Sequence, residues 1–376
     1  MPGHEKSLLE YLRSENPVIN GDMCRPGGNT KSTGDIWETP RKIEVWEDFE
    51  FNSLKSIYGG QLQEVLTSHF AFQDFSAIPQ FPFREIHDEN SLECLIVKWN
   101  HSMMADALST AQSYLDNRLT HGKIHMVRGG QADYPASNSK LRPDWGGVQR
   151  PTTRISKPKN VLPGDTKLSK KWSSGLIKLG QVHFNHKKID WLRPLTQVFS
   201  YCVRSNSRYG YVITDKELVV LRIRPGSETD SQSAVDIQGS FESSDPTPAT
   251  RARSTGILEF QAIPWENDAI AADEECEVMT VNLALWWLHM MAAESSEIEE
   301  HYTPLPVAAR TTGAIINSQN DSFTFSDMSG VGRRFADVAF EPQNSQSAPK
   351  ASRRGRKRLR DDGINQKSRR GKKLRS

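Results

Sequence analysis

One stretch of the sequence, residues 142–201, limits what this chain can fold into more than any other. It holds three short pieces, Arg142-Pro143-Asp144-Trp145, Pro163-Gly164-Asp165-Thr166-Lys167 and Gln197-Val198-Phe199-Ser200-Tyr201. A carboxylate follows a proline, a second carboxylate comes two residues before a lysine, and a glutamine precedes a tyrosine by four residues. Each piece alone is typical of a turn, a solvated strand face or a helix surface. Their order and spacing are what indicate a site.

The second piece reads as a strand, and a strand turns alternate side chains to the same face. Asp165 and Lys167 then lie side by side, and Asp144 adds a second carboxylate from a neighbouring strand. Mg²⁺ prefers one or two carboxylates together with water and phosphate oxygens. Such an ion polarises a phosphoryl oxygen and lowers the pKa of the attacking water, which Lys167 could orient or deprotonate. On a helix, Gln197 and Tyr201 lie one turn apart on one face.

This order of motifs resembles the PD-(D/E)XK nuclease superfamily, which has the restriction-endonuclease-like fold, and in particular its RecB-like branch with a Gln-x-x-x-Tyr helix. Residues 141–223 carry the resemblance, and the flanks match only in outline. It implies an α/β fold with an α-β-β-β-α-β core and a mixed sheet. It also implies Mg²⁺ or Mn²⁺ bound by the two aspartates. The active-site residues that it implies are Asp144, Asp165, Lys167, Gln197 and Tyr201.

A stripe of apolar residues at helical spacing predicts a long helix from Leu92 to Leu115. The resemblance makes this the opening helix of the core, where nucleases of this fold often have a further acidic residue. Glu93 and Asp106 are the candidates, but Asn100 occupies the helix centre, so the third metal ligand stays open. The Trp99-Asn100 pair resembles the Trp-Asn pair that uncharacterised fungal nuclease-like proteins have in this helix.

Other segments have clear periodicity. Expected strands are 123–127, 141–148 and 257–263, a hairpin is expected at 209–214 and 218–224, and helices are expected at 54–72 and 278–293. The basic loop from Gln149 to Pro158, and Lys170-Lys171-Trp172, can each be read in two ways. They are either a solvated loop and a Trp that caps the core, or surfaces for a nucleic-acid strand.

Composition divides the chain into four parts. The mean hydropathy is −0.61, which is polar for one compact globule. We expect a disordered lead-in over 1–40, in which Ser7 to Leu12 could form a short helix, an accessory segment packed on the core over 41–84, and the nuclease-like domain over 85–300. Inside that domain the Ser- and Asp-rich residues 226–255 are expected to form a disordered loop. A disordered basic tail is expected over 301–376.

The cysteines and histidines give little sign of a further metal site. No cysteine pair has metal-ligand spacing, and the His183 and His186 pair has no third ligand near it in sequence, so we do not expect zinc. The cysteines read as buried thiols in a reducing compartment. Neither a signal peptide nor a membrane span is indicated.

The tail is the most basic part of the chain. From Lys350 to Ser376 there are 13 Lys/Arg and two Asp, a net charge of +11. Of the 48 Lys/Arg and 46 Asp/Glu in the chain this leaves 35 and 44, a net charge of −9. Two basic clusters resemble a bipartite nuclear localisation signal and predict a nuclear protein that binds an import receptor and phosphate backbones. The expected nucleic-acid contacts are Arg353, Arg354, Arg356, Lys357, Arg358, Arg360, Lys367, Arg369, Arg370, Lys372 and Lys373.

Three functions are compatible with these features. The first is Mg²⁺-dependent hydrolysis of phosphodiesters in DNA or RNA. The second is a catalytically inactive nuclease-fold module that binds nucleic acid or protein, which the acidic body of the chain favours. The third is a chromatin-associated adaptor in which only the tail matters. The sequence does not specify the oligomeric state.

Overall fold

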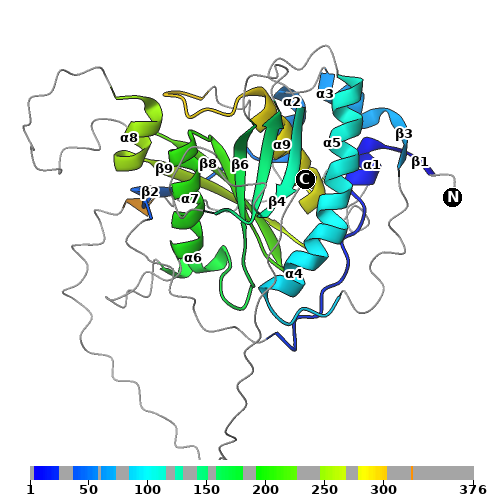
Figure 1. The fold of residues 1–376 in the computed structure, drawn as a ribbon, viewed down its shortest axis with the longest axis horizontal. Helices are drawn as coiled ribbons and strands as arrows, with labels where there is room; N and C mark the ends of the chain where they lie inside the picture. Colours follow the sequence, from blue (N-terminus) through cyan, green and yellow to red (C-terminus); the bar gives the residue numbers. More distant parts are fainter. Residues whose placement is uncertain are drawn as a thin grey trace, which may run out of the picture. The chain divides into compact units, whose positions relative to one another are not determined.

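The computed structural model describes residues 4–24, 37–57, 61–72, 84–115, 123–129, 142–150, 158–180, 192–226, 246–267, 278–302 and 323–324. The chain divides into two units, residues 1–333 and 334–376, and every described residue belongs to the first. That unit is an α/β fold in which helices cover a mixed β-sheet (Figure 1). The predicted fold class is confirmed at this level.

The main sheet has eight strands in the order β10-β2-β9-β8-β7-β6-β5-β4. Neighbouring strands are antiparallel except for the pairs β6–β7 and β2–β9, which are parallel. The strands are β2 (Lys42–Val45), β4 (Lys123–Arg128), β5 (Trp145–Arg150), β6 (Lys159–Thr166), β7 (Tyr209–Ile213), β8 (Glu217–Arg224), β9 (Ile257–Pro264) and β10 (Phe323–Thr324). A separate antiparallel pair is formed by β1 (His4–Ser7) and β3 (His69–Phe72).

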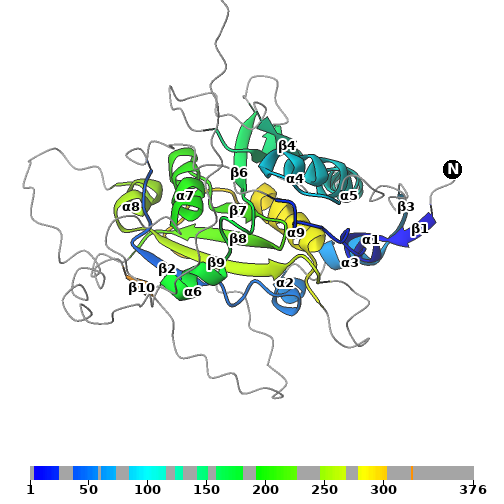
Figure 2. The same cartoon turned by 90° about the horizontal axis from the view of Figure 1, so that it is seen from below.

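The helices lie in two groups around the sheet. They are α1 (Leu8–Leu12), α2 (Phe51–Ile57), α3 (Gln61–Thr67), α4 (Glu89–Ile96), η2 (Val97–His101, a π-helical turn), α5 (Ser102–Tyr114), α6 (Gly175–Gly180), α7 (Arg193–Ser205), α8 (Pro248–Thr255) and α9 (Val281–Glu294). Both views place α7 beside α8 (Figures 1 and 2), and these two helices are in contact. On the other side, α5 and α9 pack on β4.

The sheet separates two hydrophobic cores, and β7 shows how. Tyr209, Tyr211 and Ile213 enter the core formed with α1, α4, α5 and α9. Val212, between them, enters the core formed with α7 and α8. This is the two-residue alternation of a strand that is buried on both faces.

The predictions made from periodicity are confirmed for most of the sheet. The strand at 123–127, the hairpin at 209–224 and the strand at 257–263 are β4, β7–β8 and β9. The helix predicted at 278–293 is α9, which begins at Val281. These segments have strong apolar patterns because they are buried in one core or in both.

Three local predictions are wrong. Residues 4–24 are not a disordered lead-in, because β1 pairs with β3 and the Leu8 and Leu12 side chains are buried in the core. The long helix predicted over 54–72 is two short helices followed by β3. Part of the loop predicted to be disordered is α8, where the Thr247 side chain accepts a hydrogen bond from the Thr250 amide.

The predicted helix from Leu92 to Leu115 exists but is interrupted by η2, which turns Trp99 and Asn100 into the core. Trp99 Nε1 donates to Asn16 Oδ1 at 2.9 Å, and Asn282 Nδ2 donates to the same oxygen at 3.2 Å. Asn100 Nδ2 donates to Asn282 Oδ1 at 2.7 Å. The π turn therefore joins the N-terminal segment to α9 through buried polar groups.

Candidate active site

The pairing of β5 with β6 brings the two predicted carboxylates together. Trp145 is opposite Gly164 in this antiparallel pair, so Asp144, directly before β5, is level with Asp165 near the end of β6. The Thr166 amide donates to Asp144 Oδ2 at 2.9 Å. Trp145 Nε1 donates to Thr166 Oγ1 at 2.7 Å, which fixes the same corner from the core side. The sequence predicted that Asp144 lies within a strand, whereas it lies directly before the first residue of β5.

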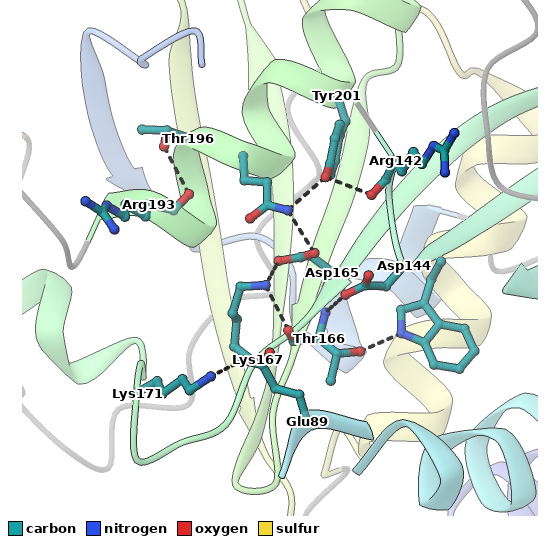
Figure 3. Close-up of polar contacts among 12 residues, drawn as sticks. Glu89, Arg142, Asp144, Asp165, Thr166, Lys167, Lys171, Arg193, Thr196 and Tyr201 are labelled. Atoms are coloured by element: carbon teal, nitrogen blue, oxygen red, sulfur yellow. Dashed lines mark hydrogen bonds and ion pairs between the residues drawn. The ribbon is translucent and has the colours of Figure 1, made fainter. Parts of the chain in front are cut away.

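Asp165 and Lys167 are a buried ion pair (Figure 3). The Asp165 side chain is 1% exposed and that of Lys167 is 19% exposed. Lys167 Nζ also donates to the Thr166 carbonyl at 2.9 Å, and the Lys167 amide continues the pairing with β7 by donating to the Ile213 carbonyl at 3.0 Å. The ammonium is therefore held in one place and lies on the α7 side of the sheet.

Helix α7 supplies the other two predicted residues. Gln197 Nε2 donates to Asp165 Oδ1 at 3.2 Å and to the Tyr201 hydroxyl at 2.8 Å. The Tyr201 hydroxyl donates to the Arg142 carbonyl at 3.0 Å (Figure 3). One turn of helix thus connects Asp165 to the backbone two residues before Asp144. All five predicted active-site residues belong to one connected group.

Burial and charge act in opposite directions at this group. Burial raises the pKa of Asp165, and the nearby Asp144 carboxylate raises it further, while the Lys167 ammonium opposes both. Burial alone would lower the pKa of Lys167, but the charges of Asp165 and Asp144 raise it above its ordinary value. Two carboxylates with one ammonium leave an excess of negative charge, which a cation would relieve.

The donor set fits a divalent cation of the Mg²⁺ type. Asp165 Oδ2 is buried and accepts no hydrogen bond of ordinary geometry, although the Lys167 ammonium is beside it. Hard cations prefer such carboxylate oxygens, and Mg²⁺ keeps several waters beside one or two of them. In the described segments, no group of three or more His, Cys, Asp or Glu side chains could hold a metal. Among the described side chains, Asp144 and Asp165 are the ones that could hold such an ion here.

Neither candidate for a third acidic ligand belongs to this group. Glu93 forms an ion pair with Arg128 at the end of β4. Asp106 accepts a hydrogen bond from the Tyr11 hydroxyl at 3.3 Å, among the N-terminal elements. Both side chains are held by other partners, so the sequence candidates are not supported as ligands.

Glu89 is the acidic residue of this helix that sequence reasoning missed. It is the first residue of α4, just after the N-cap Asp88, and its charge acts on Lys167. Its carboxylate pairs with Lys171 Nζ at 3.1 Å (Figure 3). The available signal was the N-cap residue Asp88, which places Glu89 in the first turn of the helix. An acidic residue in the first turn is common and stabilising.

The loop after β6 has a structural role. Trp172 is 1% exposed and packs in the core beside α7, so the interpretation as a core cap is correct. Lys170 Nζ donates to the carbonyls of Asp22 and Cys24 at 3.2 and 3.3 Å. The Ser169 amide and hydroxyl both donate to Asp215, each at 2.6 Å. These contacts hold rigid the segment that follows Lys167.

Other predicted features lie outside the described residues. These are residues 151–157 of the predicted basic loop, the pair His183 and His186, and the tail from residue 350 onward. Within the described helices, none is both long and apolar enough to cross a bilayer.

Comparison with known proteins gives no match, whether by family model, curated protein or solved structure. The site must therefore be interpreted from its own geometry.

Proposed function

We propose that this chain is a metal-dependent nuclease that hydrolyses phosphodiesters in DNA or RNA. The observation that carries the proposal is the convergence of Asp144, Asp165 and Lys167 at the adjacent ends of β5 and β6. Gln197 holds Asp165 from α7, at 3.2 Å. Two carboxylates can bind a divalent cation, and a lysine beside them can stabilise negative charge on a phosphate.

The order of the elements supports a restriction-endonuclease-like core. Along the chain α5 is followed by β4, β5, β6, α7 and β7, with the short helix α6 inserted before α7. The pairs β4–β5 and β5–β6 are antiparallel, and β6–β7 is parallel. This is the α-β-β-β-α-β order that the motif resemblance implies, with α7 as the second helix.

In the proposed reaction the residues of the site have different roles. A bound Mg²⁺ or Mn²⁺ would polarise the phosphoryl oxygen and supply an activated water. Asp144 and Asp165 would hold that ion through their carboxylate oxygens. Lys167, whose ammonium is fixed against Asp165, would orient the attacking water and stabilise negative charge on the phosphate. Gln197 and Tyr201 are positioning residues, because they fix Asp165 and the backbone before Asp144.

A second candidate function is a nuclease-fold module that binds without cutting. Residues 1–349 have a net charge of −9, whereas proteins that bind nucleic acid are usually basic over the contact surface. In this alternative the tail supplies the affinity for nucleic acid and for an import receptor, and the protein is nuclear. The site would then be a remnant in which Lys167 only neutralises Asp165.

Nicking of supercoiled plasmid and cleavage of labelled RNA, with Mg²⁺, Mn²⁺ or EDTA, test the proposal. The wild-type protein should cut at least one substrate with metal and neither with EDTA. Asp165→Asn and Asp144→Asn should abolish cutting.

Asp106→Asn is the matched control, because Asp106 is a carboxylate outside the candidate site that accepts a hydrogen bond from the Tyr11 hydroxyl. It should retain activity. Equal activity in all four proteins would indicate a contaminant. Binding without cutting in the wild-type protein would favour the inactive module.

A further inference from the structure

Two buried rings lie behind the candidate site, on the opposite face of the sheet from Lys167. Tyr211 on β7 and His289 on α9 are both 0% exposed. Their ring centroids are 6.5 Å apart, with an angle of 49° between the ring planes. The Tyr211 hydroxyl and His289 Nε2 are both buried without a hydrogen-bond partner. Buried tyrosine hydroxyls nearly always have a partner, so these two atoms require an explanation.

The two atoms are complementary. His289 Nδ1 lies 2.7 Å from the Leu285 carbonyl. A carbonyl can only accept, so Nδ1 carries the hydrogen and Nε2 presents a lone pair. Burial lowers the pKa of His289 to about 4, so the ring is neutral near pH 7. A hydroxyl donor and a ring acceptor thus lie on two neighbouring buried rings, and no direct hydrogen bond joins them.

The same rings cover the strands that hold the two aspartates. A Cβ placed on Gly164 would meet Tyr211 Cζ at 2.3 Å, and one on Gly147 would meet His289 Cδ2 at 3.3 Å. Gly164 precedes Asp165 on β6, and Gly147 is three residues after Asp144 on β5. Movement of either ring would therefore be transmitted to the backbone that positions a carboxylate.

We propose that Tyr211 and His289 bind one internal water between them and that this water-bridged pair fixes the ends of β5 and β6 behind the two carboxylates. Water is the ligand that suits a buried polar site with one donor and one acceptor that do not bond each other directly. Tyr211 and His289 are then positioning residues, and that part of the inference rests on the proposed function.

A double-mutant cycle in thermal unfolding tests the bridge. Tyr211→Phe removes the hydroxyl and keeps the ring, and should lower the melting temperature by about 2–4 °C, the loss of roughly one hydrogen bond in a domain of this size. In a His289→Leu background the same change should have no effect. In a His289→Gln background, where an acceptor remains near the position of Nε2, the effect should persist. Tyr209→Phe, two residues away on the same strand, should act equally in all backgrounds.

A raised or unchanged melting temperature for Tyr211→Phe in the wild-type background would overturn the bridge, because removing an unpaired buried hydroxyl relieves a cost. An equal fall in the wild-type and His289→Leu backgrounds would overturn it as well. If His289→Leu does not fold, the wild-type and His289→Gln backgrounds decide the question.

Mg²⁺ titration by calorimetry tests the positioning role. Tyr211→Phe should weaken Mg²⁺ binding several-fold while Tyr209→Phe leaves it unchanged. Unaltered affinity in Tyr211→Phe would refute the positioning role. If the wild-type protein binds no Mg²⁺, the proposed function fails, and the double-mutant cycle alone decides this inference.

Discussion

Gly164, the middle residue of Pro163-Gly164-Asp165, cannot take a side chain without disturbing the core. A Cβ there would lie 2.3, 2.5 and 2.7 Å from three carbons of the Tyr211 ring. That ring is fully buried, so it cannot swing into solvent. Overpacking of a rigid core typically lowers the free energy of unfolding by about 1–3 kcal/mol. With three contacts of this kind, Gly164→Ala should lower it by about 3 kcal/mol. For a domain of this size that is a fall of roughly 6–12 °C in melting temperature.

Thermal unfolding followed by circular dichroism measures this effect. Gly175→Ala is the matched control, because the nearest atom to its Cβ position is Ser173 Oγ at 3.6 Å. It should leave the melting temperature unchanged or slightly raised. Gly164→Ala should cost much less in a Tyr211→Leu background, where the ring is gone. A melting temperature within about 2 °C of the wild-type value for Gly164→Ala would refute the packing argument.

Two further predictions concern ionisation and the tail. Burial and Asp144 raise the pKa of Asp165, and metal binding requires the ionised carboxylate. Mg²⁺ affinity should therefore rise as the pH increases from acidic to neutral. Calorimetry on Asp165→Asn should show a weaker dependence of the affinity on pH. Equal slopes for both proteins would remove Asp165 from the metal site. Deletion of residues 350–376 should move a tagged protein out of the nucleus and reduce the salt dependence of its DNA binding, since this segment has a net charge of +11. Unchanged localisation would leave the tail without a targeting role.

Sequence patterns predicted the elements around the site because those elements are buried on both faces. Strand β7 is buried at every residue, and helix α7 has buried apolar residues at helical spacing. The alternation of β6, continued one residue beyond its end, places Asp165 and Lys167 on one side. The spacing of Gln197 and Tyr201 on one helical face was likewise enough to predict that they act together. What sequence could not give was the connection to Arg142, which depends on how the chain returns to the site.

Most of the wrong predictions have one cause, which is that tertiary contacts outweigh local composition. A short helix over Ser7 to Leu12 could be predicted, but the Pro, Gly, Asn and Ser residues around it gave no sign that the segment is held by contacts of α1 with α3 and α9. The π turn at Trp99 depends on partners far along the chain, Asn16 and Asn282, which no local pattern shows. Helix α8 was a different case. Thr247 followed by Pro248 is a readable helix start, and the polar composition around it obscured the signal.

The most direct test of the central claim is the rate of metal-dependent cleavage in Lys167→Gln. Glutamine keeps a hydrogen-bond donor beside Asp165 but removes the ammonium, so the buried carboxylate is not left without a partner. Lys159→Ala is the control, since Lys159 begins the same strand and pairs with Glu297 at 3.4 Å on the surface. At saturating Mg²⁺, Lys167→Gln should cut at least about 100-fold more slowly than the wild-type protein, with Lys159→Ala unaffected. Cleavage by Lys167→Gln at the wild-type rate would contradict the account.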